Sequence, residues 1–334
     1  MSNTRYATPV DGQVRLLTKV ARMYHERGIR QADIASALNI SQAKVSRLLK
    51  RAATLGIVRT TVTVAPGVYS HLEEALEAKF GLLEAVVVDV DNDDDERAVL
   101  AAIGAAAGSY LEASLSGGDR IGISSWSQTL LAMVDRMRPF PMGGATEVVQ
   151  LLGGIGTPDV QNQAQRLATE CARMLGAEPV YVPAPGVVAD QAIRDSLLND
   201  GALAEVTRRW KELTMAIVGI GSIEPSELLA ESGNAFSPAD RARLLEAGAV
   251  GDICHHVFTI DGTSVTGDLA SRTISIPVDD FLAVPRRIGI AGGHRKQEPI
   301  LGALRGGWVN VLITDIDTAR ALLGDDAPGA RSDA

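Results

Sequence analysis

The sequence predicts an α/β protein with a small winged helix-turn-helix head and a large Rossmann-like domain built on a parallel sheet. Three observations predict this fold class. At 334 residues the chain is long enough for two domains. Residues 30–55 show two helical patterns joined by a tight turn, and from Ala85 short apolar runs alternate with longer helical stretches. Apolar strands alternating with helices are typical of a parallel sheet that helices cover on both faces.

Charge is divided unevenly along the chain. The whole sequence carries a net charge of −9. Residues 1–60 hold eleven Lys/Arg against three Asp/Glu, a net charge of +8, and the remaining residues hold 21 against 38, a net charge of −17. A basic head on an acidic body concentrates the attraction for phosphates in the head. The charge pattern therefore favours a nucleic-acid contact at the N-terminal end of the chain.

The first helical pattern of the head contains Ile34, Ala35 and Leu38 at helical spacing. Asn39 follows, and Asn tolerates the left-handed conformation that a sharp turn requires. Ser41 is then expected to cap the next helix, since its hydroxyl can accept a hydrogen bond from a backbone N–H that has no partner within the helix.

The second helical pattern turns Val45, Leu48, Leu49 and Ala52 inward, which leaves a polar, basic face outside. Such side chains hydrogen-bond base edges or contact phosphates in a major groove. An ordinary helical hairpin with a solvated basic face is the alternative. The candidate DNA-binding residues are Ser41, Gln42, Ala43, Lys44, Ser46, Arg47, Lys50 and Arg51.

Two further segments complete the expected head. A preceding helix with Leu17, Val20, Ala21 and Tyr24 supplies the third side of a small core, and the β-branched run Ile57–Val64 is expected to form a wing strand.

The expected domain boundaries follow from the breaks in pattern. Residues 1–66 form the head and residues 67–82 a linker helix, which could be a spacer or a contact between subunits. Residues 83–326 form the large domain, and residues 327–334 a disordered tail.

Strands and helices alternate through the large domain. The expected strands are Ala85–Val90, Arg120–Ile123, Glu147–Leu152, Pro179–Pro183, Ala216–Ile220, His256–Ile260, Arg287–Ile290 and Asn310–Thr314. The expected helices are Asp95–Ser114, Gln128–Met137, Asn162–Leu175, Ala189–Leu213, Pro238–Ala247, Glu298–Arg305 and Ile316–Leu323.

Three loops of this domain are candidates for a small-molecule site, because ligands of parallel sheets bind at the carboxyl ends of the strands. They are residues 122–129, 152–156 and 290–296. Small residues let backbone N–H groups approach an anion, and Lys296 could place a charge on a phosphate or carboxylate. Glycine pairs that serve only as turns are the alternative.

The cysteines and adjacent histidines carry no metal signal. Cys171 and Cys254 lack metal-ligand spacing, and reduced thiols suit a cytoplasmic protein. His255 and His256 would point to opposite faces of a strand, so they are interpreted as structural. Neither a signal peptide nor an apolar run of about 20 residues occurs, so we expect no membrane contact. No metal or cofactor is expected.

Four stretches resemble blocks of one family, the SorC family of sugar-binding transcriptional regulators. AGGHRKQEPILGALRGGWVNVLITDIDTARALL is similar to its signature of a glycine pair, a lysine and an LITD strand. GAVGDICHHVFTIDG, GISSWSQT and NISQAKVSRLLKRAATLGIV are similar to three further blocks, so the resemblance covers nearly the full length. It implies a large domain related in fold to sugar-phosphate isomerases and glucosamine-phosphate deaminases. It also implies binding of a sugar, polyol or sugar phosphate, and assembly as a homodimer or homotetramer.

The resemblance also implies a set of effector-binding residues. The family often has Gly and Arg where this chain has Ser127 and Gln128, which removes a cation and makes an unphosphorylated sugar or polyol eligible, while Lys296 keeps a phosphate eligible. Asp252 could accept hydrogen bonds from sugar hydroxyls, and Trp126 could stack on a sugar or fill the core. The candidates are Gly122, Ser124, Ser125, Trp126, Ser127, Gln128, Thr129, Gly153, Gly154, Asn162, Asp252 and Lys296.

The sequence therefore favours a transcriptional regulator that binds a double-stranded DNA operator under control of a carbohydrate effector. A sugar-phosphate isomerase or deaminase is the alternative, with His294 and Asp252 eligible as general bases. The fused basic head weighs against an enzyme, and a DNA-binding protein without an effector would leave the three loops unexplained.

Overall fold

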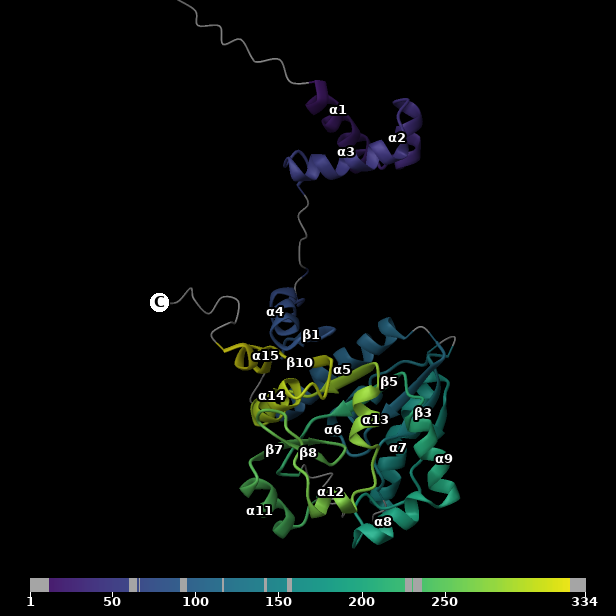
Figure 1. Ribbon diagram of the computed structural model, residues 1–334, viewed down its shortest axis with the longest axis vertical. Coiled ribbons are helices and arrows are strands. Elements are labelled where there is room, and N and C mark those ends of the chain that lie inside the picture. Colours follow the sequence, from purple (N-terminus) through teal and green to yellow (C-terminus); the bar gives the residue numbers. More distant parts are fainter. Residues whose placement is uncertain are drawn as a thin grey trace, which may run out of the picture. The chain divides into compact units, whose positions relative to one another are not determined.

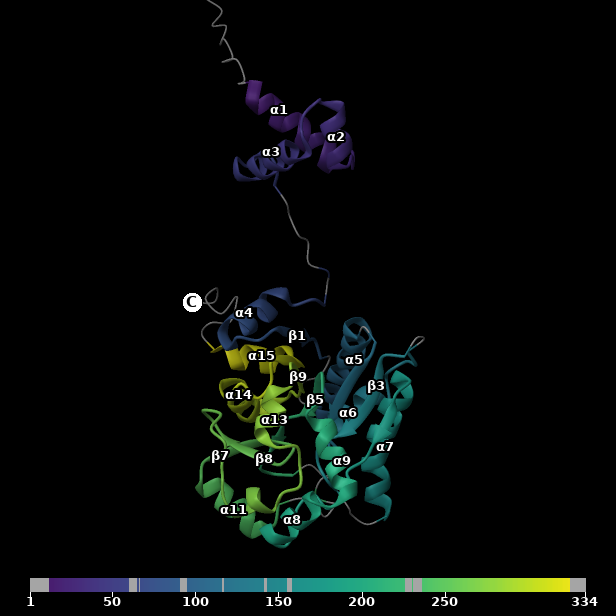
Figure 2. The ribbon, with the colours of Figure 1, turned by 45° about the vertical axis from the view of Figure 1, so that its right-hand side comes forward.

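The computed structural model describes residues 12–59, 65, 67–90, 95–115, 117–140, 143–154, 158–225, 230 and 236–324, without the side chains of 158–164. The chain divides into two compact units, Met1–Val64 and Ala65–Ala334, and each is described by itself (Figures 1 and 2). Among the described residues, no helix combines the length and apolar character that crossing a membrane requires.

The first unit is a bundle of three short helices, α1 (Gly12–Ala21), α2 (Gln31–Ala37) and α3 (Gln42–Thr54), with a π-helical segment at Arg22–Glu26. Each helix contributes one side of a common core, as the apolar spacing predicts. The buried residues of this core are Leu17, Val20, Ala21, Ile34, Ala35, Val45, Leu48 and Ala52.

The α2–α3 turn has the predicted chemistry. Asn39 lies in the left-handed region at φ 52°. The Ser41 hydroxyl accepts a hydrogen bond from the backbone N–H of Lys44 at 3.2 Å, which caps α3. Both predictions are confirmed.

Two predictions for the head are not met. Tyr24 is 38% exposed and lies edge-on to His25, because the π-helical turn after α1 rotates it away from the core. The expected wing strand does not include residues 57–59. The N–H groups of Ile57 and Val58 donate back to the Ala52 carbonyl at 2.9 and 3.2 Å, since Gly56 ends α3 in a left-handed conformation. The rest of the expected wing, residues 60–64, lies outside the described residues.

A fully parallel seven-stranded sheet is the centre of the second unit, as predicted. The strand order is β1-β10-β9-β5-β2-β3-β4. The strands are β1 Glu84–Val88, β2 Asp119–Ile123, β3 Ala145–Gln150, β4 Glu178–Val180, β5 Met215–Gly219, β9 Arg286–Ile290 and β10 Val311–Asp315.

Helices cover both faces of this sheet, because alternate residues of each strand are apolar on either side. In β5, Met215 and Ile217 belong to one buried cluster and Ala216 and Val218 to the other. The first cluster includes α5 (Glu96–Ser114), α6 (Gln128–Val134) and α7 (Pro158–Leu175). The second includes α4 (Ser70–Phe80), α9 (Gly201–Trp210), α13 (Val278–Ala283), α14 (Gln297–Arg305) and α15 (Ile316–Leu323).

Helix α4 is hydrogen-bonded to the edge strand β1. The carboxylate of Glu77 accepts from the N–H of Ala85 at 3.0 Å, and that of Glu73 accepts from the N–H of Val87 at 3.1 Å. These carboxylates satisfy donors that an edge strand leaves unpaired. Helix α4 therefore packs as part of the second unit.

A second sheet is small and antiparallel, with order β6-β7-β8. It consists of β6 Gly221–Ser222, β7 Ala249–Ile253 and β8 His256–Thr259. The sequence placed 256–260 among the strands of the parallel pattern, and this is wrong. The two-residue turn between β7 and β8 allows only an antiparallel hairpin.

The predicted helix Ala189–Leu213 is two helices, α8 (Gln191–Leu198) and α9. Asp200 interrupts it, because its carboxylate accepts from the N–H of Ala202 at 3.0 Å and so starts a new helix. The remaining helices among the described residues are α11 Pro238–Glu246, α12 Asp268–Arg272 and a 3₁₀ turn at His294–Lys296.

The left-handed residue of the α2–α3 turn has a testable consequence. Asn39→Val should lower the stability of the head by about 1–2 kcal/mol, because a β-branched residue is strained at φ 52°. Asn39→Gly should leave it unchanged or raise it, since Gly adopts this φ freely. Hydrogen exchange of the α2 and α3 amides in the full chain measures both. Equal exchange in the two variants would contradict the assigned turn.

Candidate functional site

A pocket of about 290 Å³ lies at the carboxyl ends of the adjacent strands β9, β5 and β2. The chain passes from β2 outward to β3, but from β5 it continues to the opposite side, so the strand order reverses between β2 and β5. Ligands of open parallel sheets bind at such reversals. Residues of the pocket wall are Glu96, Val99, Leu100, Ser124–Thr129, Leu152, Gly219–Ser222, Glu224, Pro225, Asp252, Cys254, His255 and 291–296.

The loop between β2 and α6 is held by its own serine hydroxyls. Ser124 Oγ accepts from the N–H of Gly219 at 3.2 Å, and Ser125 Oγ donates to the Leu152 carbonyl at 3.1 Å. Ser127 Oγ accepts from the N–H of Leu130 at 3.2 Å and caps α6. These bonds tie the loop to the ends of β5 and β3, so the serines position the wall as well as line it.

The loop after β9 is pinned by the buried carboxylate of Asp315. Its Oδ2 accepts from the N–H of Gly293 and from the Thr318 hydroxyl, both at 2.7 Å, and its Oδ1 accepts from the N–H of Thr318 at 2.8 Å. A Cβ at Gly292 would collide with this carboxylate. The Asp315 bonds thus fix the start of the segment that carries Lys296.

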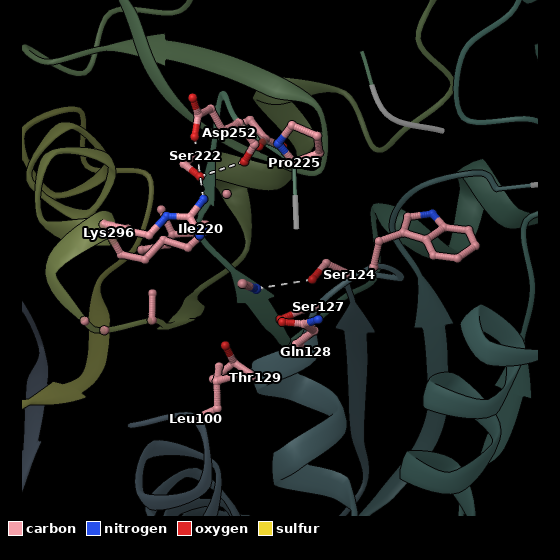
Figure 3. Close-up of a pocket in the computed structure, with 18 of the residues that line it drawn as sticks. Leu100, Ser124, Ser127, Gln128, Thr129, Ile220, Ser222, Pro225, Asp252 and Lys296 are labelled. Atoms are coloured by element: carbon pink, nitrogen blue, oxygen red, sulfur yellow. Dashed lines mark hydrogen bonds and ion pairs between the residues drawn. The ribbon is translucent and has the colours of Figure 1, made fainter. Parts of the chain in front are cut away.

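Lys296 and Asp252 place opposite charges on one wall of the pocket. Lys296 Nζ donates to the Ile220 carbonyl at 3.0 Å. Burial lowers the pKa of Lys296, and the charge of Asp252 opposes this shift. Burial raises the pKa of Asp252, while the hydrogen bond from the N–H of His255 and the charge of Lys296 lower it. Figure 3 shows Lys296, Ile220, Ser222 and Asp252 grouped apart from Ser124, Ser127, Gln128 and Thr129.

The mouth of the pocket carries an exposed charge cluster. Arg295 lies 4.0 Å from a Glu96 oxygen and 3.7 Å from a Glu224 oxygen. Both cations of the wall, Arg295 and Lys296, therefore face carboxylates of the same wall.

His255 lies in a turn and not in the strand that the sequence predicted. Cys254 and His255 form the two-residue turn between β7 and β8, with φ values of 51° and 63°. His255 is 4% exposed, and burial lowers its pKa to about 4, so the ring is neutral near pH 7. Within the described part of the chain, neither ring nitrogen has a hydrogen-bond partner. His256 fits the structural interpretation, because its Nε2 contacts the Ile276 carbonyl at 2.6 Å.

Eight of the twelve predicted effector-binding residues line this pocket. They are Ser124, Ser125, Trp126, Ser127, Gln128, Thr129, Asp252 and Lys296. Trp126 is also 9% exposed, and its Nε1 has no hydrogen-bond partner among the described residues.

The predicted glycines lie outside the described pocket wall. Gly122 is inside β2, where a Cβ would collide with Leu151 and Leu213. The N–H of Gly153 donates to the Ile274 carbonyl at 2.9 Å, and a Cβ at Gly154 would lie 2.5 Å from the Trp126 ring. At all three positions a neighbouring side chain or carbonyl group occupies the space that a Cβ would need, which explains the glycines. Asn162 is in α7, and its side chain lies outside the described residues, as do residues 155–157.

Sequence reasoning missed the wall after β5 and the β7–β8 turn. The run Ile217-Val218-Gly219-Ile220-Gly221 shows a Gly-rich strand end like the three chosen loops, and that signal could have identified the first. The turn has no local signal, because Cys and His seldom adopt two successive positive φ values.

The candidate DNA-binding residues lie on the exposed side of the head. All eight, from Ser41 to Arg51, are exposed, whereas Val45 and Leu48 between them and Ala52 after them are buried. Arg47 Nε donates to the Ala43 carbonyl at 3.3 Å. The arrangement presents four cations, at positions 44, 47, 50 and 51, on one helix.

Comparisons with known proteins agree with these two units. Residues 67–324 match the family model described as "Putative sugar-binding domain". The chain is 33% identical to the deoxyribonucleoside regulator of Bacillus subtilis over 310 residues, 93% of this chain and 97% of that protein. It is 32% identical to the sorbitol operon regulator of Klebsiella pneumoniae over 312 residues, 93% and 98% of the two chains. The crystal structure of the full-length Klebsiella pneumoniae regulator superposes with a TM-score of 0.70 over 93% of this chain and 99% of that one, at 30% identity.

The depressed pKa of His255 predicts a pH dependence. The folded-state pKa of about 4 lies below the ordinary value of 6.5, so between these pH values the unfolded chain binds a proton that the folded chain does not. Stability should therefore be complete above about pH 6.5 and fall as the pH drops toward 4, by at most about 3 kcal/mol. His255→Phe should remove this component. The measurement is the stability difference between wild type and variant from pH 7 to 4.5, and a constant difference would contradict the assignment.

Proposed function

The chain belongs to the SorC family of sugar-binding transcriptional regulators, and we propose that a small carbohydrate in its large domain controls its binding to operator DNA. One observation carries the proposal. A basic helix-turn-helix head and a pocket that carries polar and charged side chains at a strand reversal occur in the same chain. The head supplies DNA affinity and the pocket supplies the control.

The proposed DNA contacts divide by role. Residues near the N-terminus of α3 and on its outer face, Ser41, Gln42, Ala43, Lys44, Ser46, Arg47 and Lys50, enter a major groove, and Arg47 reads a base. Arg51, one turn further on, holds a phosphate. Their common exposure on one helix supports this division.

The proposed effector is a sugar, polyol or sugar phosphate. The acceptor Asp252 and the donor Lys296 on one wall suit the hydroxyl groups of a carbohydrate. Of the twelve predicted residues, the eight of the pocket wall and Asn162 are the proposed contacts, and Gly122, Gly153 and Gly154 are proposed to support the wall from behind. The relatives named for deoxyribonucleosides and for a sorbitol operon support a carbohydrate-like ligand.

We further propose that the protein is not an enzyme. The two eligible bases are both engaged: Asp252 accepts from the N–H of His255 at 3.0 Å, and His294 Nδ1 contacts Gln297 at 3.2 Å. The relatives are named as regulators, which supports the same proposal.

The proposed working form is a cytoplasmic homodimer or homotetramer without a cofactor. One head of this size covers a single half-site, so specificity requires two heads related by a two-fold axis. The proposed domains are residues 1–66, the linker helix 67–82, which packs on β1 of the effector domain, the effector domain 83–326 and a tail from 327.

A thermal-shift screen over sugars, polyols and their phosphates tests the effector. A ligand at 100 times its Kd should stabilise the protein by about 2.7 kcal/mol. The compound that does so should also change operator affinity in a gel-shift titration. A set of compounds that stabilise the protein but leave operator binding unchanged would contradict the proposed control.

Substitutions of Arg47 and Arg51 test the proposed base contact and the proposed phosphate contact separately. Arg47→Ala should cost about 1–3 kcal/mol on the preferred operator and relax discrimination at one position. Arg51→Ala, the matched control on the same helix, should weaken all sequences alike and reduce the salt slope by about 1. Binding-site selection with salt titration measures both. An unchanged sequence preference in Arg47→Ala would refute the assigned face.

A further inference from the structure

We propose that His255 is a specificity-determining residue of the pocket, which hydrogen-bonds one uncharged hydroxyl group of the carbohydrate effector. The inference rests on the proposed function, because it assumes that the pocket binds a carbohydrate. It assigns a role to a histidine that its sequence context marks as structural.

The β7–β8 turn holds His255 in a left-handed conformation that is unfavourable for a bulky side chain. Ile253 pairs with His256, so Cys254 and His255 alone connect the two strands, with φ values of 51° and 63°. Two-residue turns with both φ values positive favour Asn and Gly. A bulky residue kept in this conformation costs stability, and such strain is concentrated at functional sites.

The side chain of His255 adds a second cost. It is 4% exposed, and its ring lies 4.9 Å from the ring of Phe236, yet both ring nitrogens lack a partner among the described residues. A buried polar group without a partner costs about 1–3 kcal/mol. The adjacent His256 is bonded to Ile276 and Ser275. Of these two histidines, His255 is therefore the one whose ring remains available to a partner outside the described chain.

The surroundings indicate where such a partner enters. His255 is part of the pocket wall, and its own N–H donates to the carboxylate of Asp252, which faces the ammonium of Lys296. A ligand that contacts Asp252 or Lys296 at this wall would therefore lie beside His255. Asp252, His255 and Lys296 together then offer acceptors and donors at one end of the pocket.

The protonation state of the His255 ring favours a hydroxyl group of the ligand over a phosphate. Burial keeps the imidazole neutral at physiological pH, with a pKa of about 4. A neutral imidazole has one N–H donor and one nitrogen acceptor, and a hydroxyl group can meet either. The N–H of a neutral ring can also donate to a phosphate oxygen, but it contributes no positive charge, so a phosphate gains less from this ring than from a cation. The expected partner is a hydroxyl on the carbon chain of the effector.

The first test needs no effector, because two adjacent histidines give a matched pair. In thermal unfolding of the full chain at pH 7.5, His255→Phe should leave the midpoint unchanged or raise it, since no hydrogen bond is lost. His256→Phe should lower it by several degrees, because it removes the contacts to Ile276 and Ser275. A loss in His255→Phe equal to that in His256→Phe would overturn the inference, since it would show a structural partner.

The second test uses sugar pairs that differ by one hydroxyl, such as D-ribose with 2-deoxy-D-ribose and D-glucose with 2-deoxy-D-glucose, extended over the other positions of the compound that binds. Calorimetric titration of wild type should find one position at which loss of the hydroxyl weakens binding about tenfold. In His255→Phe, loss of the hydroxyl at that sugar position should no longer weaken binding, while loss of the hydroxyl at the other positions should have the same effect as in wild type. An equal loss at every position in the variant would overturn the inference. Absence of any carbohydrate effect on wild-type operator binding would instead refute the proposed function, and the ligand-free test would still decide the role of the ring.

Discussion

The carboxylate of Asp315 joins the fold of the large unit to its pocket. It ends β10, caps α15 through Thr318 and accepts the N–H of Gly293 at 2.7 Å. One buried group thus connects two neighbouring strands at their carboxyl ends. A charged group at 3% exposure is tolerated because three hydrogen bonds satisfy it. The position of Lys296 depends on this connection.

Glycines at the strand ends also leave room for polar groups to approach the backbone. A Cβ at Gly219 would lie 2.5 Å from the Ser127 hydroxyl, and Cβ atoms at Gly221 and Gly292 would collide with the carboxylates of Asp252 and Asp315. At each of these positions the missing side chain makes room for an oxygen of a neighbouring element. The glycines therefore allow polar groups to approach the backbone at the edge where the strands converge.

The head and the pocket differ in how their charged side chains are arranged. Four of the cations of the head lie on the exposed face of α3, and no acidic residue occurs in the sequence between Asp33 and the end of that helix. In the pocket wall, Lys296 and Arg295 face carboxylates. The head can therefore attract a polyanion, while the pocket offers balanced donors and acceptors that suit a small polar ligand.

The sequence by itself determined the local structure of this protein. Asn39 and Ser41 predicted the head turn, apolar runs predicted the parallel strands, and loops 122–129 and 290–296 predicted two walls of the pocket. These features depend on residues a few positions apart, so a single segment contains the signal. The tertiary structure decided the rest. Placing β5 between β9 and β2 brings residues 219–222 into the wall, and the β7–β8 hairpin brings His255 there. Strand order and burial depend on contacts between distant segments, which no local pattern specifies.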